Sequence, residues 1–420
     1  MTETQVITLG CRLNTFESEI IRDQSRAAGL ENALIVNTCA VTAEAERQAR
    51  QTIRRLRRDN PKSKIIVTGC AAQLHPESFA MMAEVDRVLG NEEKLTLESY
   101  RDWGADTSPV QVADIMTVRE TAAHLVQGLE GRTRAFVQIQ QGCDHRCTFC
   151  IIPFARGNNR SLSPGDIARQ ISELVASGYR EVVLTGVDIC SYGTDLAGQP
   201  TLGELIRRLL KIVPDLPRLR LSSLDPAAMD DVLFDVLATE PRLMPHLHLS
   251  VQAMDDVILK RMKRRHLRRD VYAVVERARA VRPDVVFGAD LIAGFPTETD
   301  QQFENGLAAV TELGFAHLHV FPYSERSGTP AARMPGIAKQ LRKARSERLR
   351  MAGNAAMDAF LANRVGGLAE VLIEKDGQGL SEHYVPVRVD GQDPESGTLA
   401  RVHVTRLQGG ILVGEMLNDG

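Results

Sequence analysis

The chain has 420 residues, of which 43% are hydrophobic and 25% charged, and its formal net charge is −3. This length exceeds what one hydrophobic core supports and predicts about two or three domains. No apolar run approaches the ~20 residues that a membrane helix needs, and the N-terminus lacks the pattern of a signal peptide, so we expect no membrane association.

The first hundred residues alternate predicted strands and helices. Apolar strands are predicted over residues 4–9, 33–36 and 64–68, and helices over 15–28 and up to residue 59. Such units predict a parallel sheet, whose strands gather ligand groups at their carboxyl ends. A cysteine follows each strand (Cys11, Cys39 and Cys70), so we expect these three thiols to converge on one edge. The alternative is three ordinary buried core cysteines.

A second set of three cysteines is compact. Cys143, Cys147 and Cys150 form a C-x3-C-x2-C pattern, which differs from the paired cysteines of zinc ribbons. Thiolates hold iron–sulfur clusters, and three of them leave one iron of a four-iron cluster open to another ligand. A structural zinc site is the alternative, but it lacks a fourth cysteine, and the spacing predicts that His145 is badly placed to replace it. Two triads thus predict two clusters and, with an odd cysteine count, a reducing cytoplasmic location.

The rest of the chain predicts a linker, a barrel and a small β domain. Residues 104–134 show little periodicity, and strands are predicted over residues 135–139, 181–185, 218–222, 246–250, 285–291 and 317–321. Six strand–helix units predict a partial (β/α)6 barrel with its site at the strand carboxyl ends. A helix over 338–361 precedes a Val-rich, turn-punctuated tail over 368–417, which predicts a small β-barrel.

We therefore predict an α/β fold with three domains. Residues 1–110 form a Rossmann-like parallel domain with the dispersed cysteines, 111–134 a linker, 135–360 the barrel domain, and 361–420 the small β-barrel. Basic residues cluster at 54–58, 260–269 and 339–350. One such cluster is usually a solvated helix face, but three in a near-neutral chain favour a polyanionic partner.

Taken in order, these motifs resemble the methylthiotransferases, a branch of the radical S-adenosylmethionine (SAM) superfamily, over nearly the whole chain. The compact triad, with Phe149 and Ile151-Ile152-Pro153, resembles the superfamily's cluster loop. The tail resembles a TRAM domain, a small RNA-binding module. The other matching runs are Gly10-Cys11-Arg12-Leu13-Asn14 with Ser18-Glu19, Val36-Asn37-Thr38-Cys39-Ala40-Val41-Thr42, Gly69-Cys70-Ala71, Thr185-Gly186-Val187-Asp188, Arg220-Leu221-Ser222-Ser223, Leu249-Ser250-Val251-Gln252, Gly294-Phe295-Pro296-Thr297-Glu298 and Phe321-Pro322-Tyr323-Ser324.

The resemblance implies two 4Fe-4S clusters and SAM as cofactors. Cys143, Cys147 and Cys150 would ligate the cluster that binds and reductively cleaves SAM, and Cys11, Cys39 and Cys70 the auxiliary cluster that carries the sulfur. The partners implied are the anticodon loop of a tRNA, an electron donor such as flavodoxin, and a sulfur source. The acidic tail, with five Lys/Arg against nine Asp/Glu from residue 364 on, cannot hold RNA by phosphate attraction alone.

Further barrel residues are candidates for SAM contacts, and no catalytic residue beyond the cluster ligands is assigned. For each candidate a plain turn or packing role is the alternative. They are Gly186, Ser222, Gln252, Arg265 and Gly294. Two departures from the family pattern are Cys190, interpreted as an incidental thiol, and Ala253-Met254, where a glycine often follows Gln252.

The resemblance is greatest to the branch that converts threonylcarbamoyladenosine, next to the anticodon, to its 2-methylthio derivative. It rests on Ser222-Ser223-Leu224-Asp225-Pro226 and on the run over 258–266. The alternatives are the branches that modify isopentenyladenosine in tRNA or an aspartate of a small-subunit ribosomal protein, and a non-catalytic iron–sulfur RNA-binding protein.

Overall fold

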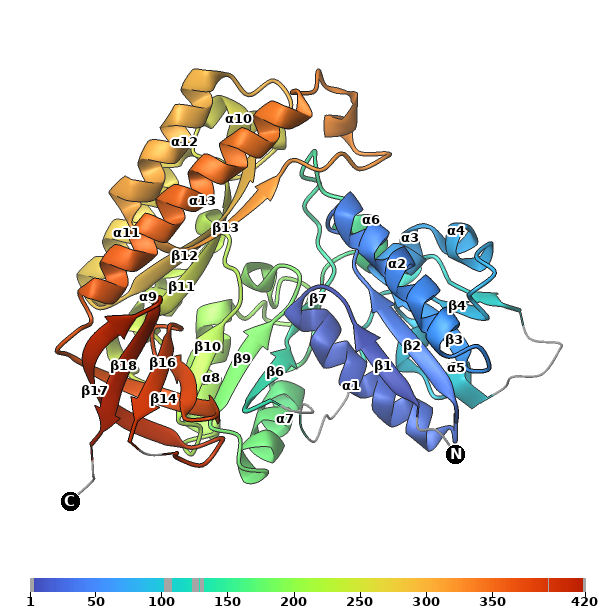
Figure 1. Ribbon diagram of the computed structural model, residues 1–420, viewed down its shortest axis with the longest axis horizontal. Coiled ribbons are helices and arrows are strands. Elements are labelled where there is room, and N and C mark those ends of the chain that lie inside the picture. Colours follow the sequence, from blue (N-terminus) through green and yellow to red (C-terminus); the bar gives the residue numbers. More distant parts are fainter. Residues whose placement is uncertain (1–3, 102–107, 123–127, 129–131, 392, 418–420) are drawn as a thin grey trace. The chain divides into compact units, whose positions relative to one another are not determined.

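The computed structural model describes residues 4–101, 108–122, 128, 132–391 and 393–417 (Figure 1). The chain divides into two compact units. The first comprises residues 1–130, 140–162 and 324–332, and the second comprises 131–139, 163–323 and 333–420. In the described part, no helix is both long and apolar enough to cross a membrane.

The first unit is built on a parallel sheet, as predicted. Its described strands lie side by side in chain order: β1 (Gln5–Thr8), β2 (Ala33–Thr38), β3 (Lys64–Gly69), β4 (Arg87–Leu89) and β5 (Val110–Gln111). The sequence predicted the first three strands. The linker prediction over 111–134 was wrong at its start, because Gln111 pairs with Leu89 and Ile115 is buried. Within that predicted linker, residues 123–127 and 129–131 lie outside the described residues.

Helices cover both faces of this sheet because its side chains alternate (Figure 1). Ile35 and Ile66 face one apolar cluster with Ile21 and Tyr100, from α1 (Arg12–Ala27) and α5 (Glu98–Arg101). Leu34, Val36 and Val67 face a second cluster. The helices that contribute to the second cluster are α2 (Ala43–Asp59), α3 (Cys70–Leu74), α4 (Pro76–Ala80) and α6 (Ile152–Arg156).

The compact cysteine loop belongs to this first unit by its contacts. It lies between β7 (Gln140–Gln141) and β8 (Arg160–Ser161), which pair antiparallel, and α6 follows the last cysteine. Ala155 of α6 packs in the same cluster as Ala71 of α3. The sequence-based boundary at residue 135 assigned the loop to the barrel domain, so the compact units divide the chain differently from those limits.

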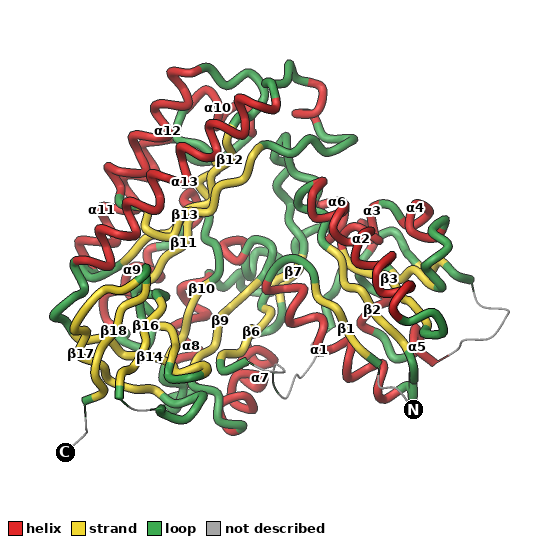
Figure 2. The backbone as a smooth tube through the Cα atoms, viewed as in Figure 1, coloured by secondary structure: helices red, strands yellow, loops and turns green. Residues whose placement is uncertain are grey.

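The second unit contains the partial barrel (Figure 2). Three strands form one parallel sheet, β6 (Arg134–Gln138), β9 (Glu181–Thr185) and β10 (Arg218–Leu221), and three another, β11 (His246–Gln252), β12 (Val286–Ala293) and β13 (Phe315–Pro322). Two single bridges, Leu219 to Leu243 and Leu224 to Leu249, join β10 to the β11 side. The six strands match the six predicted. The helices of this unit are α7 (Pro164–Ala176), α8 (Leu202–Ile212), α9 (Asp231–Thr239), α10 (Asp256–Met262), α11 (Arg268–Val281), α12 (Asp300–Leu313) and α13 (Lys339–Ala362).

The tail forms a closed five-stranded barrel in its described residues, as predicted. Its strands are β14 (Leu368–Lys375), β15 (Gln378–Ser381), β16 (Pro386–Asp390), β17 (Leu399–Gln408) and β18 (Ile411–Met416), in the order β14-β15-β16-β18-β17. Valines alternate inward along these strands, and Leu361 of α13 packs against them. Closure leaves no open strand edge.

Buried arginines join the tail barrel to the partial barrel. Arg218 and Arg220 are fully buried, and both pair with Glu181, at 3.2 and 3.0 Å. Arg220 also donates to the carbonyl oxygens of Ser381 (3.3 Å) and Glu382 (3.1 Å), and its guanidinium lies 4.8 Å from the centre of the Tyr384 ring. Because these donors are satisfied by the tail, the tail barrel is a fixed part of the second unit.

We predict that Glu181→Gln destabilises the protein and removes part of its acid sensitivity. Burial alone would raise the pKa of Glu181, but Arg220 and Arg218 lower it from 4.5 to about 2. Ionised Glu181 therefore stabilises the fold above pH 4.5, by about 3 kcal/mol, and this contribution is lost as pH falls from 4.5 towards 2. Urea unfolding should show a large difference between wild type and variant at pH 7 and a small one near pH 2.5.

The matched control is Glu304→Gln, which breaks the exposed pair with Arg348. It should change the free energy of unfolding by no more than about 1 kcal/mol at any pH. A Glu181→Gln protein as stable as wild type at pH 7 would contradict the prediction.

Candidate functional site

The three dispersed cysteines converge on one edge of the parallel sheet. Cys11 follows β1 at the start of α1, Cys39 follows β2, and Cys70 begins α3 directly after β3. The pKa of the Cys39 thiol is raised to about 11, first by burial and then by the neighbouring Cys70 and Cys11 thiols. The pKa of Cys11 is also raised, by the surrounding protein and by Cys70, although part of its side chain reaches solvent. Sequence reasoning thus placed these thiols correctly.

Glycine precedes two of these cysteines because the backbone turns sharply there. Gly10 and Gly69 have φ angles of +105° and +92°, which L-residues with side chains rarely adopt. A Cβ on Gly69 would lie 2.4 Å from the carbonyl oxygen of Thr38, and one on Gly10 would lie 2.7 Å from Cβ of Cys39. The Gly-Cys pairs therefore let neighbouring strand ends approach closely enough to share one site.

A buried guanidinium lies beside these thiols. Arg156, at the end of α6, donates from Nε to Sγ of Cys70 (3.1 Å) and from Nη2 to Oδ1 of Asn14 (2.5 Å). It also forms an ion pair with Glu17, which Lys94 contacts from the other side at 2.7 Å. Two cations against one carboxylate leave a net positive charge near the cysteines. That charge favours thiolates, the form in which cysteine binds metal.

The rest of this buried network is also satisfied. Burial alone would raise the pKa of Glu17, but Arg156 and Lys94 lower it to about 2. The Asn14 amide donates to the carbonyl oxygens of Leu9 (2.7 Å) and Thr38 (3.0 Å), and so ties two strand ends together. Every polar partner thus helps to fix the positions of the cysteines.

The compact cysteine loop is held by its own backbone and side chains. The N–H of Cys143 donates to the carbonyl oxygen of Gly157 (3.0 Å), and that of Cys150 donates to the carbonyl oxygen of Cys147 (3.1 Å). Arg146 donates to the carbonyl oxygen of Cys143 (2.8 Å) and to Oδ1 of Asn158 (2.8 Å). The three thiols are half-buried and none forms a disulfide.

The spacing of the thiols bears on the choice between zinc and a cluster. A mononuclear zinc holds sulfur atoms about 3.8 Å apart, given Zn–S bonds of about 2.3 Å. Among the described residues, neither cysteine triad has all three sulfur atoms within 4.8 Å of one another. Cluster ligands bind separate irons and so lie farther apart. Neither triad, as the structure describes it, therefore has the sulfur spacing of a mononuclear zinc site.

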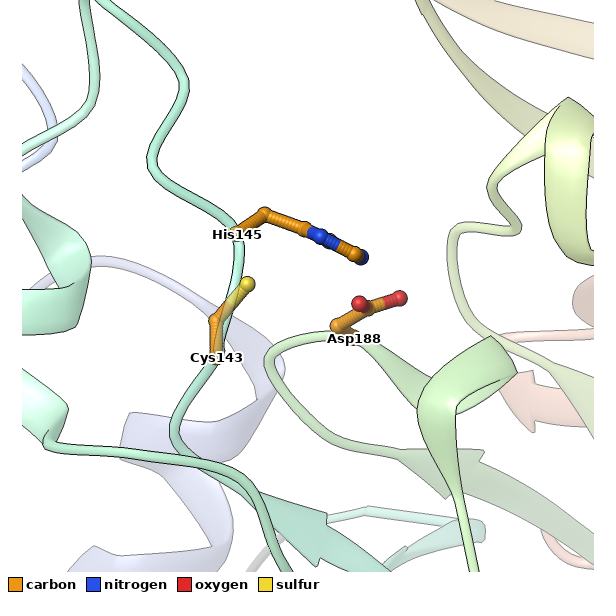
Figure 3. Close-up of side chains that lie close together, drawn as sticks. All are labelled: Cys143, His145 and Asp188. Atoms are coloured by element: carbon orange, nitrogen blue, oxygen red, sulfur yellow. The ribbon is translucent and has the colours of Figure 1, made fainter. Parts of the chain in front are cut away.

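His145 lies nearer to the cysteines than the spacing predicted. A ring nitrogen of His145 lies within 4.8 Å of the Cys143 sulfur, and both side chains project from the same loop (Figure 3). Among the described residues, no group of close ligand atoms joins His145 to all three cysteines, so a closed zinc site with His145 as fourth ligand finds no support.

Four of the five SAM-contact candidates lie at the carboxyl ends of barrel strands, and the fifth, Arg265, lies between α10 and α11. Gly186 and Ser222 follow β9 and β10, Gln252 ends β11, and Gly294 follows β12. A Cβ on Gly294 would lie 2.4 Å from Cγ of Arg342, so this glycine admits a side chain of α13. Arg265 lies 3.4 Å from Asp225 and is 43% exposed. Contact with SAM stays a prediction for all five.

Cys190 has a structural environment. Its sulfur accepts the N–H of Asp225 at 3.3 Å, and burial, followed by Asp188, raises the pKa of the thiol well above its usual value. A neutral thiol of this kind is a poor nucleophile and metal ligand.

Some arginines of the three basic clusters form ion pairs within the protein. Arg57 pairs with Asp86 (2.5 Å), Arg264 with Asp225 (3.2 Å), and buried Arg345 with Glu298 (2.8 Å). Other members of the first two clusters have exposed side chains: Arg54, Arg55, Arg58, Lys260, Arg261, Lys263, Arg265 and Arg269.

Two family models match the chain. One, described as the radical SAM superfamily, matches residues 137–309, and one, described as uncharacterized protein family UPF0004, matches residues 3–90. The radical SAM methyltransferase TsrM from Kitasatospora setae, solved with cobalamin and a [4Fe-4S] cluster, aligns with a TM-score of 0.52 at 16% identity. That alignment covers 79% of this chain and 77% of TsrM and concerns the fold alone.

Several curated relatives match nearly the whole chain. Threonylcarbamoyladenosine tRNA methylthiotransferase MtaB of Rickettsia prowazekii is 52% identical, covering 92% of this chain and 91% of the relative. MtaB of Thermotoga maritima is 36% identical, covering 92% and 88%. A tRNA-2-methylthio-N(6)-dimethylallyladenosine synthase of Geobacillus thermodenitrificans is 32% identical, covering 98% and 83%.

The partial barrel and the C-x3-C-x2-C loop define a radical SAM enzyme. With 52% identity over nearly its whole length, the chain belongs to the MtaB family of tRNA methylthiotransferases.

Sequence reasoning missed the residues that surround the dispersed cysteines. Arg156 follows the compact loop by only six residues, yet nothing in the pattern links it to Cys70, 86 residues earlier. Glu17 and Lys94 lie on different elements 77 residues apart. The available signal was a charged residue in an otherwise apolar helix face, as at Glu17 between Phe16 and Ile20.

We predict that Arg156→Met weakens both the first unit and its metal loading. The substitution removes the N–H donor to Cys70 and leaves buried Glu17 with Lys94 alone, at a cost of about 3–5 kcal/mol in the free energy of unfolding. Iron and sulfide contents after anaerobic reconstitution, together with urea unfolding of the metal-free chain, measure the two effects.

Arg156→Lys keeps the charge but loses the forked guanidinium. Its iron content and its free energy of unfolding should lie between those of wild type and Arg156→Met. Arg169→Met breaks an exposed helix pair with Asp166 and serves as control. Wild-type iron content and stability in Arg156→Met would rule out this role.

Proposed function

We propose that the protein converts threonylcarbamoyladenosine next to the anticodon of tRNA to its 2-methylthio derivative by radical SAM chemistry. The observation that carries the proposal is the pair of three-cysteine sites, one on a loop and one at three strand ends. The target nucleoside is the one named for the MtaB relatives, which match this chain at up to 52% identity.

The cysteines take separate roles in the proposal. Cys143, Cys147 and Cys150 hold the cluster that binds SAM, and Cys11, Cys39 and Cys70 hold the auxiliary cluster. When bound, the two clusters and SAM supply the electron, the radical and the methylated sulfur for the transfer. Three thiolates for each cluster leave one iron open to another ligand.

The remaining residues position these groups and shield them. Arg156 supplies charge and an N–H donor at Cys70, and Asn14 fixes two strand ends. The strand-end residues Gly186, Ser222, Gln252 and Gly294, with Arg265, are the proposed SAM contacts. Outer contacts of this kind tune cluster potential and affinity.

In the proposal, exposed basic side chains bind the RNA. Those of the first two basic clusters suit the phosphates of an anticodon loop, while the tail barrel, proposed to be a TRAM domain, carries more acidic than basic residues. The target base is unstacked for reaction, as is usual for recognition of single-stranded loops. Seven thiols without a disulfide suit a reducing cytoplasm with a one-electron donor such as flavodoxin and a separate sulfur source.

Mass spectrometry of tRNA nucleosides from a strain lacking the gene tests the proposal. We expect the 2-methylthio derivative of threonylcarbamoyladenosine to disappear and its precursor to accumulate, and expression of the wild-type chain to reverse both changes. If instead isopentenyladenosine loses its methylthio group, or a ribosomal protein loses a methylthio mass, the substrate assignment is wrong.

We further predict that substituting a cysteine of one triad has a different effect from substituting a cysteine of the other. Cys39→Ala should bind about half the wild-type iron, still cleave SAM to 5′-deoxyadenosine, and form no methylthio-nucleoside, because only the auxiliary ligand set is broken. Cys39 suits this test because Arg156 donates to Cys70 instead, so the buried charge network stays intact.

The matched variant is Cys147→Ala, which should lose SAM cleavage and product together. Both variants are assayed after anaerobic reconstitution, with iron, 5′-deoxyadenosine and nucleoside measured on the same samples. Full methylthiolation by Cys39→Ala would show that the dispersed triad is structural, and retained deoxyadenosine formation by Cys147→Ala would defeat the assignment of the compact one.

A further inference from the structure

Three polar side chains lie together on the inner face of the partial barrel. His248, Asp290 and His319 occupy the neighbouring strands β11, β12 and β13. The opposite face carries helices: a Cβ on Gly353 of α13 would lie 2.7 Å from Leu318, and Arg279 of α11 lies over Phe287. Because strand side chains alternate, His319 and Asp290 point away from the helices.

The three side chains form one hydrogen-bonded cluster. Nε2 of His248 lies 2.9 Å from Oδ1 of Asp290, and Nδ1 of His319 lies 3.2 Å from the same oxygen. Gly288 makes room for the buried imidazole, since a Cβ there would lie 2.2 Å from Nδ1 of His248. The position of the His248 ring therefore requires glycine at residue 288.

The cluster lies where the filled floor of the barrel meets its accessible inner face. Below it, the His246 ring packs on His317 and Tyr384, with centroids 4.7 and 5.3 Å apart. Above it, Ser250, Ile292 and Phe321 are partly or well exposed on the same face. The His319 side chain is 59% exposed, whereas that of His248 is 7% exposed.

This arrangement orients His319 for a ligand. Burial alone would raise the pKa of Asp290, but its two histidine partners hold it well below its usual range, so Asp290 is ionised and accepts from both rings. With Nδ1 on Asp290, the exposed imidazole presents its Nε2 edge to the accessible face. In the imidazolium form of histidine both ring nitrogens donate, so Nδ1 can bond Asp290 while Nε2 bonds an anion.

We propose that His319, positioned by Asp290 and His248, binds the carboxylate of the threonylcarbamoyl group on the substrate nucleoside. This inference rests on the proposed function. Phe321, two residues further along the same face and 37% exposed, stacks on the purine. The cluster thereby selects a nucleoside that carries an acidic substituent over one that lacks it.

The test compares two forms of the same tRNA, with threonylcarbamoyladenosine or unmodified adenosine at the target position. Wild-type protein should bind the modified form more tightly. In His319→Phe the Kd and KM for the modified form should rise about ten- to hundredfold, the loss expected for one charge-assisted hydrogen bond, while binding of the unmodified form changes little. SAM cleavage without tRNA should stay at the wild-type rate.

His403→Phe replaces an exposed histidine of β17 and is the matched control, expected to leave both affinities unchanged. Asp290→Asn tests whether Asp290 positions His319. It keeps the side-chain shape and should lower the affinity for the modified tRNA less than His319→Phe does. Three outcomes would overturn the inference: unchanged discrimination in His319→Phe, equal loss for both tRNAs, or a stoichiometric non-cluster metal that His319→Phe removes.

The two proposals fail in different ways. A wild-type protein that neither prefers nor methylthiolates the threonylcarbamoyl form would refute the proposed function. A wild-type protein that does both, paired with a His319→Phe variant that keeps the preference, would refute only the role of His319.

Discussion

One buried guanidinium holds together the thiol site of the first unit. Arg156, on α6, contacts Cys70 of α3 and both Asn14 and Glu17 of α1. A buried charge of this kind is tolerated only when its donors are met, so α6, α1 and α3 are fixed relative to one another. The cost of burying Arg156 is offset by Glu17, and the remaining positive charge favours the thiolates that a cluster requires.

The second unit also buries arginine side chains, and there the tail barrel supplies acceptors for them. Arg218 and Arg220 are buried at the floor of the partial barrel, and Glu181 neutralises only one of their two charges. Carbonyl oxygens at the β15–β16 turn of the tail barrel accept the remaining N–H groups of Arg220. The tail barrel therefore completes the floor of the partial barrel. The tail, which resembles a small RNA-binding module in sequence, thus contacts buried residues of the partial barrel.

These buried networks explain how polar chemistry is held in apolar surroundings. The dispersed thiols of the first unit lie at the ends of three strands, and the His248–Asp290–His319 cluster of the second lies on three strands. In both places a glycine makes the room: Gly69 at Thr38 in the first unit and Gly288 at His248 in the second. Strand ends place the dispersed thiols and strands carry the histidine cluster, and in both sites buried charged side chains hydrogen-bond the reactive groups.

The sequence by itself predicted the first three strands of the parallel sheet, the six strands of the partial barrel, the two cysteine triads and the family resemblance, because these features are local. Apolar runs of five or six residues predict strands, and Cys143, Cys147 and Cys150 are fixed by spacing alone. Short strands such as β4 and β5 were missed, since two or three residues carry no period. Only the tertiary structure brought Arg156 to Cys70 and Glu17, placed His145 beside Cys143, and gathered His248, Asp290 and His319 from three strands. Such contacts join residues that lie tens of positions apart, and which partner a buried charge finds is decided by packing, which no local pattern records.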